Sequence, residues 1–399
     1  MIPYSRQSIS KKDIQSVLKV LKSSWLTQGP AIPAFEQALA KYCGARYAVA
    51  LSSGTAALHL ACLAMGVQKG DEVITSPNSF AATANCILYA GGRPVFCDVE
   101  PEQWNLDPSK LEKHLSRKIK GIIPVHFAGH PCDMESIAKI ARKKKLFVLE
   151  DACHALGGEY RIGKKKYRAG SCSHSDAAIL SFHPVKSIAT GEGGAVLTNR
   201  KDIYKKILAF RTHGITKDAG KFINKEEAFW NDGGKLRPAG WYYEMQELGF
   251  NYRFTDLQSA LGMSQLKRLP EFMAKRQAIA RIYNKAFLDF PGLRTPLQAP
   301  GVKSACHLYV IQLELEKLKA GRAEIFDALR RQGLGVQVHY IPIHYQPYYR
   351  GLGFKKGSLP VCEDYYRRAI SIPIFPAMTR AEIKTVIQTV KKVLTDYLK

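Results

Sequence analysis

Several features that mark special classes of protein are absent from this chain of 399 residues. No apolar run approaches the length needed to cross a membrane. The nine cysteines are odd in number and lack CxxC spacing, which argues against a disulfide framework or a zinc site. Residues 1–8 show no charged region followed by an apolar one, so we expect no signal peptide. These absences predict a cytoplasmic protein without a metal centre.

Acidic residues are also scarce, since 34 Asp and Glu stand against 59 Lys and Arg, for a formal net charge of +25. Such an excess fits nucleic acid, an acidic membrane surface or small anionic ligands. The lysine run 143–145 ends an expected helix, and the run 164–166 lies in a Gly-flanked loop. Because no known nucleic-acid-binding module accompanies them, we interpret them as solvated surface and expect neither nucleic acid nor a membrane as partner. A basic regulatory protein that binds nucleic acid is the alternative to an enzyme, and the net charge would permit it.

What the sequence does contain is an alternation of short β-rich runs with helical ones, after an amphipathic helix at 10–22. The β-rich runs are 47–51, 72–75, 94–98, 121–126, 146–150, 178–182 and 195–198. This order is typical of an α/β domain with a largely parallel sheet, whose sites gather at the carboxyl ends of the strands.

A long helix at 255–288 leads into a smaller α+β domain. There we expect strands at 306–315 and 336–340 and helices at 323–332 and from Thr379 onward. We place the boundary near Pro270, which gives domains 1–269 and 270–399.

The stretch Ser181-Phe-His-Pro-Val-Lys186 follows an apolar run that predicts a buried strand. A lysine at the end of such a strand loses hydration, which lowers its pKa toward the range where the neutral amine attacks a carbonyl. A plain surface lysine is the ordinary interpretation in so basic a chain. Partners elsewhere must therefore support a chemical role for Lys186.

Three other stretches offer such partners. Residues 50–59 predict a Gly-containing turn that opens an Ala-rich helix, where free N–H groups favour a phosphate, although a capped tight turn explains it too. Asp151 follows an apolar strand, with His154 three residues on, and either caps a helix or holds a cationic ring nitrogen. Phe80 follows another strand and serves either core packing or ring stacking. A lysine, an acid, an aromatic face and a phosphate cradle together are what pyridoxal phosphate requires.

In this order the motifs resemble those of the DegT/StrS family of nucleotide-sugar aminotransferases, which are fold type I pyridoxal-phosphate enzymes. The resemblance extends through residues 23–30 and 249–256 and covers most of the chain. It implies a large α/β domain with a mostly parallel sheet and a smaller α+β C-terminal domain. Within the family, His183 and the segment 245–253 look closest to the branch that aminates C4 of 4-keto sugars in pseudaminic acid biosynthesis.

The resemblance also implies roles for the matching residues. Lys186 would form the Schiff base with pyridoxal phosphate and move the proton. The cofactor would be bound by Thr55, Ala56, Phe80, Asp151, His154, Ser181 and Asn251. Asn251 would reach the cofactor of a neighbouring subunit, which makes the enzyme a homodimer with shared active sites. The substrate pocket would be lined by Tyr4, Ser24, Trp25, Leu26, Thr27, Gly54, His183, Gln337, Val338, His339 and Tyr340.

The implied reaction moves the amino group of L-glutamate to C4 of a UDP-4-keto-6-deoxy-N-acetylhexosamine, giving UDP-4-amino-4,6-dideoxy-N-acetyl-β-L-altrosamine. A sibling enzyme acting on a UDP-4-keto-pentose or on GDP-4-keto-6-deoxymannose stays open, because motifs do not decide the sugar. A family dehydratase fits less well, since its relatives replace with histidine the lysine that is intact here as Lys186. Residues 216–243 form a longer segment than in shorter family members, and it is either a lid over the sugar or a surface hairpin.

Overall fold

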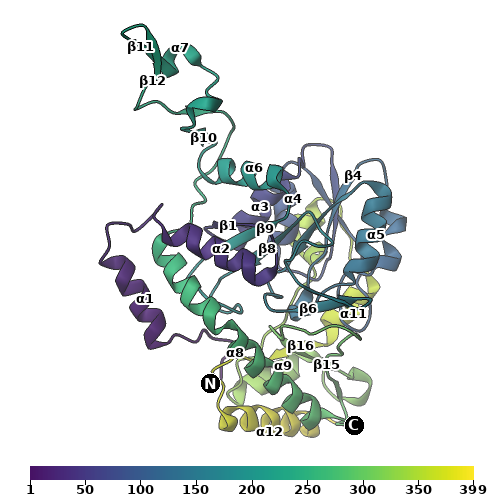
Figure 1. Cartoon of the computed structure of the whole chain (residues 1–399). Coiled ribbons are helices and arrows are strands. Elements are labelled where there is room, and N and C mark those ends of the chain that lie inside the picture. Colours follow the sequence, from purple (N-terminus) through teal and green to yellow (C-terminus); the bar gives the residue numbers. More distant parts are fainter.

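The computed structural model describes residues 1–399 and is built on one seven-stranded sheet (Figure 1). The strands lie in the order β1 (Tyr47–Leu51), β9 (Gly194–Thr198), β8 (Ala177–Ser181), β5 (Phe147–Asp151), β4 (Ile119–Ile123), β2 (Glu72–Thr75) and β3 (Arg93–Phe96). Only β9 runs antiparallel to its neighbours, and the remaining pairs are parallel. The predicted mostly parallel α/β sheet is therefore confirmed.

Helices cover both faces of this sheet. The helices of the large domain are α2 (Ala31–Cys43), α3 (Gly54–Ala64), α4 (Ala82–Tyr89), α5 (Met134–Lys144) and α6 (Lys201–Arg211). In β8, Ala178 and Leu180 pack in the apolar cluster under α2, whereas Ala177 and Ile179 pack in the cluster under α3. Because both faces are buried, the strand is apolar along its whole length instead of alternating.

The C-terminal part has its own three-stranded antiparallel sheet and its own core. The sheet contains β14 (Leu293–Arg294), β15 (Tyr309–Leu313) and β16 (Ala369–Ile372), and the helices are α9 (Arg322–Arg331), α10 (Pro347–Gly351), α11 (Pro360–Arg368) and α12 (Arg380–Asp396). Both parts share α8 (Asp256–Phe287), which Thr255 begins with a capping box. Pro270, the predicted boundary, lies within α8, and the division into 1–269 and 270–399 stays a prediction.

The expected strand at 336–340 is wrong. Gln337 makes only a single bridge, to Ser371, and the chain beyond it is irregular. Just before it, the chain is tied to the N-terminal segment, because the Gly335 N–H donates to the Ile2 carbonyl. Likewise the Ile374 N–H donates to the Tyr4 carbonyl, so residues 2–4 pack on the C-terminal part although they open the large domain in sequence.

Other strand ends also differ from the expectation. β3 and β4 stop at Phe96 and Ile123, before the polar side chains of Asp98 and His126. Asp98 instead accepts from the N–H groups of Val361 and Cys362 at the start of α11. β15 is likewise shorter than the expected 306–315.

An arm formed by residues 215–245 projects from the body of the molecule (Figure 1). It contains β10 (Ile215–Thr216), α7 (Lys225–Ala228), β11 (Phe229–Asp232), β12 (Lys235–Pro238) and β13 (Glu244–Met245). At its base β10 and β13 pair antiparallel, with Thr216 opposite Glu244. α1 (Lys11–Leu21) and the hairpin of β6 (Glu159–Ile162) and β7 (Lys165–Arg168) lie at other edges, and no helix is both long and apolar enough to span a bilayer.

Candidate active site

A cavity of about 600 Å³ opens at the carboxyl ends of β5 and β8, beside the start of α3. The predicted residues that line it are Tyr4, Gly54, Thr55, Phe80, Asp151, His154, Ser181, His183, Lys186, Gln337, Val338, His339 and Tyr340. Parallel strands bring these segments together because their carboxyl ends meet at one edge of the sheet. A larger cavity of about 940 Å³, between Trp104 and residues 287–297, contains none of them.

Lys186 reaches this cavity from the turn that follows β8. The turn is held by the Lys186 N–H, which donates to the His183 carbonyl at 2.8 Å. Burial lowers the pKa of the Lys186 ammonium below its usual value, although the nearby Cys153 and Asp151 oppose the shift. The side chain therefore yields a neutral amine more readily than a lysine in water.

Asp151 is the last residue of β5 and is buried at the cavity floor. Its Oδ2 accepts from the Thr83 hydroxyl at 2.7 Å, and its Oδ1 accepts from the Cys153 N–H at 3.2 Å. No helix begins after it, so the helix-cap interpretation does not apply. Both donors to the Asp151 carboxylate are neutral, and no cation is hydrogen-bonded to it. Its negative charge is therefore available to pair with a cationic ring nitrogen.

The start of α3 faces the hydroxyl of Ser181. Ser53 caps the helix by accepting from the Ala56 N–H at 3.0 Å, whereas the N–H groups of Gly54 and Thr55 donate to no other group of the chain. A Cβ on Gly54 would lie 3.0 Å from the Ser181 Cβ and 3.3 Å from its Oγ. Glycine at this position thus leaves two free N–H groups and one hydroxyl side by side, which suits a phosphate.

Histidines and a tyrosine form the opposite wall. The His154 Nε2 lies 3.0 Å from the Tyr340 hydroxyl, and the His339 Nδ1 lies 2.8 Å from the Ser371 hydroxyl. Burial lowers the pKa of His154 well below its usual value, with the charges of Lys186 and His339 acting in the same direction. Burial and Lys186 lower the pKa of His339 to about 3. Both imidazoles are therefore neutral near pH 7.

Sequence reasoning missed several residues of the cavity. Ser79, Thr83, Cys153 and Glu192 line it, and the buried His307 packs its ring 4.4 Å from that of His154 between centroids. His307 lies in the apolar run 305–311, where nothing in the local pattern distinguishes it from a core residue. Thr83, in contrast, lies three residues after Phe80, in the first turn of α4, and its N–H donates to the Phe80 carbonyl.

Six predicted residues lie outside the cavity of their own chain. They are Ala56, Ser24, Trp25, Leu26, Thr27 and Asn251. Residues 24–27 form the turn between α1 and α2, where Thr27 bridges to Thr255 and Trp25 lines a separate cavity of about 440 Å³. Asn251 is exposed and bridges to Thr212. Ala56 lies in the first turn of α3 beside Gly54 and Thr55, and its N–H already donates to Ser53. The other five residues do not line the cavity that contains Lys186.

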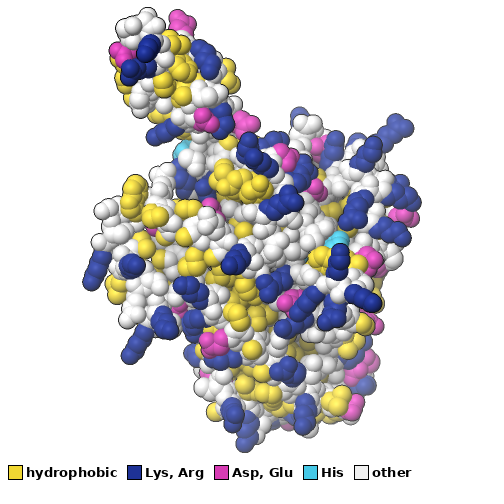
Figure 2. All heavy atoms as spheres, viewed as in Figure 1, with side chains coloured by type: hydrophobic (Ala, Val, Ile, Leu, Met, Phe, Trp, Pro, Cys, Tyr) yellow, Lys and Arg dark blue, Asp and Glu magenta, His cyan; other side chains and the backbone are white.

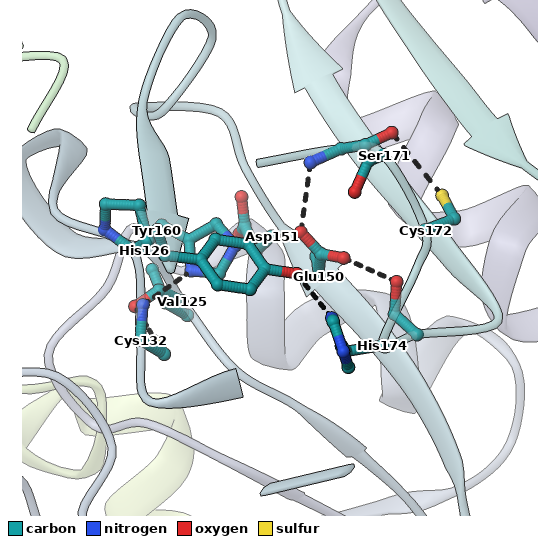
Figure 3. A network of polar contacts seen from close by, with 12 residues as sticks. Val125, His126, Cys132, Glu150, Asp151, Tyr160, Ser171, Cys172 and His174 are labelled. Carbon is teal, nitrogen blue, oxygen red and sulfur yellow. Dashed lines mark hydrogen bonds and ion pairs between the residues drawn. The ribbon is translucent and has the colours of Figure 1, made fainter. Parts of the chain in front are cut away.

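A second polar network supports the end of β5 from the opposite face (Figure 3). The fully buried Glu150 accepts from the His126 Nε2 at 3.0 Å, from the Gly170 N–H and from the Ser175 hydroxyl. Burial alone would raise the pKa of Glu150, but these hydrogen bonds lower it. The His126 Nδ1 accepts from the Cys132 N–H, so the ring is neutral and donates through Nε2. The backbone N–H of His126 also donates to the Asp151 carbonyl, so the network holds the end of β5 that carries Asp151.

A lysine of lowered pKa, a buried carboxylate and a free helix N-terminus around one cavity fit pyridoxal phosphate, with the phosphate at α3 and the ring nitrogen at Asp151. On a mostly parallel sheet this set defines a fold type I pyridoxal-phosphate enzyme. The sequence model of the DegT/DnrJ/EryC1/StrS aminotransferase family matches residues 7–391, and the chain belongs to that family. Its cofactor is pyridoxal 5'-phosphate.

Curated relatives cover nearly the whole chain. Spore coat polysaccharide biosynthesis protein SpsC of Bacillus subtilis is 40% identical over 98% of this chain and 97% of its own. UDP-4-amino-4,6-dideoxy-N-acetyl-beta-L-altrosamine transaminase of Campylobacter jejuni is 37% identical over 99% of this chain and 98% of its own. The chain is thus similar to a nucleotide-sugar transaminase and to a polysaccharide biosynthesis protein at comparable levels.

Solved structures agree. Helicobacter pylori PseC, an aminotransferase involved in the biosynthesis of pseudoaminic acid, superposes with a TM-score of 0.88 at 33% identity over 99% of both chains. The PLP form of the putative sugar aminotransferase Spr1654 of Streptococcus pneumoniae superposes with a TM-score of 0.88 at 28% identity over 100% of both chains. The protein is therefore an aminotransferase of the sugar-modifying type.

Proposed function

We propose that the protein transfers the amino group of L-glutamate to C4 of a UDP-4-keto-6-deoxy-N-acetylhexosamine, with UDP-4-amino-4,6-dideoxy-N-acetyl-β-L-altrosamine as product. The observation that carries the transamination is the meeting of Lys186 and Asp151 in one cavity beside the free N-terminus of α3. The Campylobacter jejuni relative and PseC support the sugar and the pseudaminic acid pathway.

Pyridoxal phosphate, when bound, supplies an electron sink for the bond that breaks at the carbon carrying the amino group. In this chain Asp151 would keep the ring nitrogen protonated, and Phe80, which is 62% exposed in the cavity, would cover a ring face. Gly54 and Thr55 would hold the phosphate through their N–H groups, together with the Ser181 hydroxyl.

Lys186 would carry the proton between carbons, because it lines the same cavity as Asp151 and its lowered pKa lets it lose and regain that proton. His154, neutral and aligned by the Tyr340 hydroxyl, would lie near the ring hydroxyl. Tyr4, His183 and residues 337–340 would contact the sugar. Tyr4 and residues 337–340 lie on the wall formed with the C-terminal part, whereas His183 lies on the turn that carries Lys186, so residues of both walls would contact the sugar.

The cavity of a single chain has too few cations for these substrates. Lys186 is the only lysine or arginine among its lining residues, whereas the acids Asp151 and Glu192 both face it. Glutamate carries two carboxylates and a UDP-sugar carries a diphosphate, and anions of this kind are bound in proteins by Lys, Arg or free N–H groups. We therefore propose a homodimer in which a second copy completes each site.

The surface of the chain supports this assembly. The arm exposes large apolar side chains at Ile223, Trp230, Leu236, Trp241, Tyr243 and Met245. Figure 2 shows apolar side chains on the surface of the arm. None of the arm residues lines the cavity of its own chain, so we propose that the arm acts at the site of another copy and not as a lid over its own. The exposed side chains of Trp25 and Leu26 and the exposed Asn251 would meet the partner as well. Exposed apolar groups of this size mark contact surfaces, and we assign the arm to the partner's site.

The second candidate is a sibling aminotransferase acting on a UDP-4-keto-pentose or on GDP-4-keto-6-deoxymannose. A different sugar stays open because the chain is at least as similar to SpsC, a spore coat polysaccharide biosynthesis protein, as to the Campylobacter jejuni transaminase. In either case we propose a cytoplasmic enzyme, because all nine cysteines are free thiols and a reducing compartment preserves them.

The test is a substrate panel. The purified holoenzyme is incubated with L-glutamate and, in separate reactions, with UDP-4-keto-6-deoxy-N-acetylhexosamines, a UDP-4-keto-pentose and GDP-4-keto-6-deoxymannose. Mass spectrometry detects the amino sugar, and NMR coupling constants give the configuration at C4. The proposal expects the altrosamine product, turnover of another sugar alone would select the second candidate, and no turnover of any keto sugar would refute both.

A further inference from the structure

Two buried hydroxyl groups that have no role in the steps above are hydrogen-bonded in series to the Asp151 carboxylate. The Thr83 hydroxyl lies 2.7 Å from the Asp151 Oδ2, and the Ser79 hydroxyl lies 2.7 Å from the Thr83 hydroxyl. All three side chains are at least 96% buried, at 1% exposure for Thr83 and 4% for Ser79 and Asp151. The three groups form a continuous chain at the cavity floor.

The direction of this chain follows from donor and acceptor chemistry. An ionised carboxylate has no proton to donate, so the Thr83 hydroxyl must donate to Asp151. Its single proton is then used, and its oxygen accepts from the Ser79 hydroxyl. The order of donation is Ser79 to Thr83 to Asp151, and each bond strengthens the next by polarisation.

This order of donation stabilises the negative charge of the Asp151 carboxylate. A donor stabilises the ionised form of a carboxylate more than the protonated form. The proton shared between Asp151 and a ring nitrogen therefore rests on the ring, which is the state in which the ring withdraws electrons. Asp151 receives no bond from a lysine or arginine that would compete with the ring nitrogen as counter-charge.

The same segment also holds the ring face. Phe80 lies between Ser79 and Thr83, and the Thr83 N–H donates to the Phe80 carbonyl at 3.2 Å. The turn that opens α4 thus fixes the aromatic contact and the carboxylate together. From this geometry we infer that Ser79 and Thr83 are positioning residues that keep the ring nitrogen of the cofactor protonated through Asp151.

The experiment compares Thr83→Val, which keeps the shape and removes the hydroxyl, with Thr83→Ser, which keeps the hydroxyl, and with Ser79→Ala. Each holoenzyme is reconstituted with pyridoxal phosphate labelled with ¹⁵N in the ring, and the ¹⁵N chemical shift reports protonation of that nitrogen directly. Thr83→Val is expected to move the shift toward the unprotonated value, Ser79→Ala to move it in the same direction by less, and Thr83→Ser to keep the wild-type shift.

A rate measurement accompanies the spectrum and rests on the proposed amino donor. In single turnover with L-glutamate, Thr83→Val is expected to slow the reaction by about 10- to 100-fold, the effect of one hydrogen bond to a charged group. The ¹⁵N measurement needs no substrate, so a wrong donor does not affect it. The inference is overturned if Thr83→Val keeps the wild-type shift, or if Thr83→Ser moves the shift as far as Thr83→Val does. Urea unfolding of each variant shows whether a lost signal reflects misfolding, and Thr83→Ser and Ser79→Ala, as the mildest changes, then decide the outcome.

Discussion

The shared active site predicts that two inactive variants restore each other's activity. The first variant is Lys186→Ala with an intact arm. The second keeps Lys186 but replaces residues 217–243 by Asn-Gly, a turn that joins Thr216 directly to Glu244, its partner in the β10–β13 register. Because no arm residue lines the cavity of its own chain, the shortened arm leaves that cavity intact.

The magnitude follows from the symmetry of a dimer. Random pairing of equal amounts of the two variants makes about half of the dimers mixed, and each mixed dimer has one site with both Lys186 and a partner's intact arm. Mixing by co-expression is therefore expected to give about a quarter of the wild-type activity per total protein. The matched control mixes the shortened chain with a chain that carries both Lys186→Ala and the shortened arm. This mixture should recover no activity. Full activity of the shortened homodimer, or no recovery on mixing, would refute the assignment of the arm to the partner's site.

Three further outcomes are expected. Lys186→Ala should abolish repeated turnover, measured as product per enzyme with glutamate and the keto sugar, and sustained catalysis would contradict the role of this lysine. Because burial lowers the pKa of His154 and His307, the unfolded state binds more protons than the folded state below pH 6.5. Stability should therefore fall as the pH drops below that value, by up to about 1.4 kcal/mol per pH unit for each histidine, and His307→Gln should flatten the dependence of the urea midpoint on pH. Glu150→Ala leaves the neutral His126 Nε2 donor buried without its partner at 3.0 Å, and we expect the free energy of unfolding in urea to fall by about 1–3 kcal/mol for that donor, whereas an unchanged midpoint would show that the network is dispensable.

The parts of the site that follow regular elements could be predicted from the sequence. Asp151 and Ser181 end buried strands, and the carboxyl ends of neighbouring parallel strands must meet, so a pattern of apolar runs was enough to bring these two residues together. Gly54 was predictable for a similar reason, since a helix that opens directly after a strand presents its N-terminus at the same edge of the sheet.

Other features depend on contacts that no local pattern contains. The segment 336–340 alternates like a strand, yet within it only Gln337 pairs, with Ser371, and His339 and Tyr340 line the cavity. His307 becomes part of the site only through its packing on His154. Such placements arise from tertiary contacts between distant segments, which periodicity does not encode.

The contact of residues 2–4 with the C-terminal part also constrains when the enzyme can be completed during synthesis. Residues 2–4 leave the ribosome more than 300 residues before their hydrogen-bond partners Gly335 and Ile374 are made. Tyr4 therefore reaches its place in the cavity late, after the sheet that holds Lys186 and Asp151 has had time to fold. A nascent chain could thus form the part of the site around Lys186 and Asp151 before Tyr4 joins it, and the contact of Tyr4 with the sugar waits until Gly335 and Ile374 have been made.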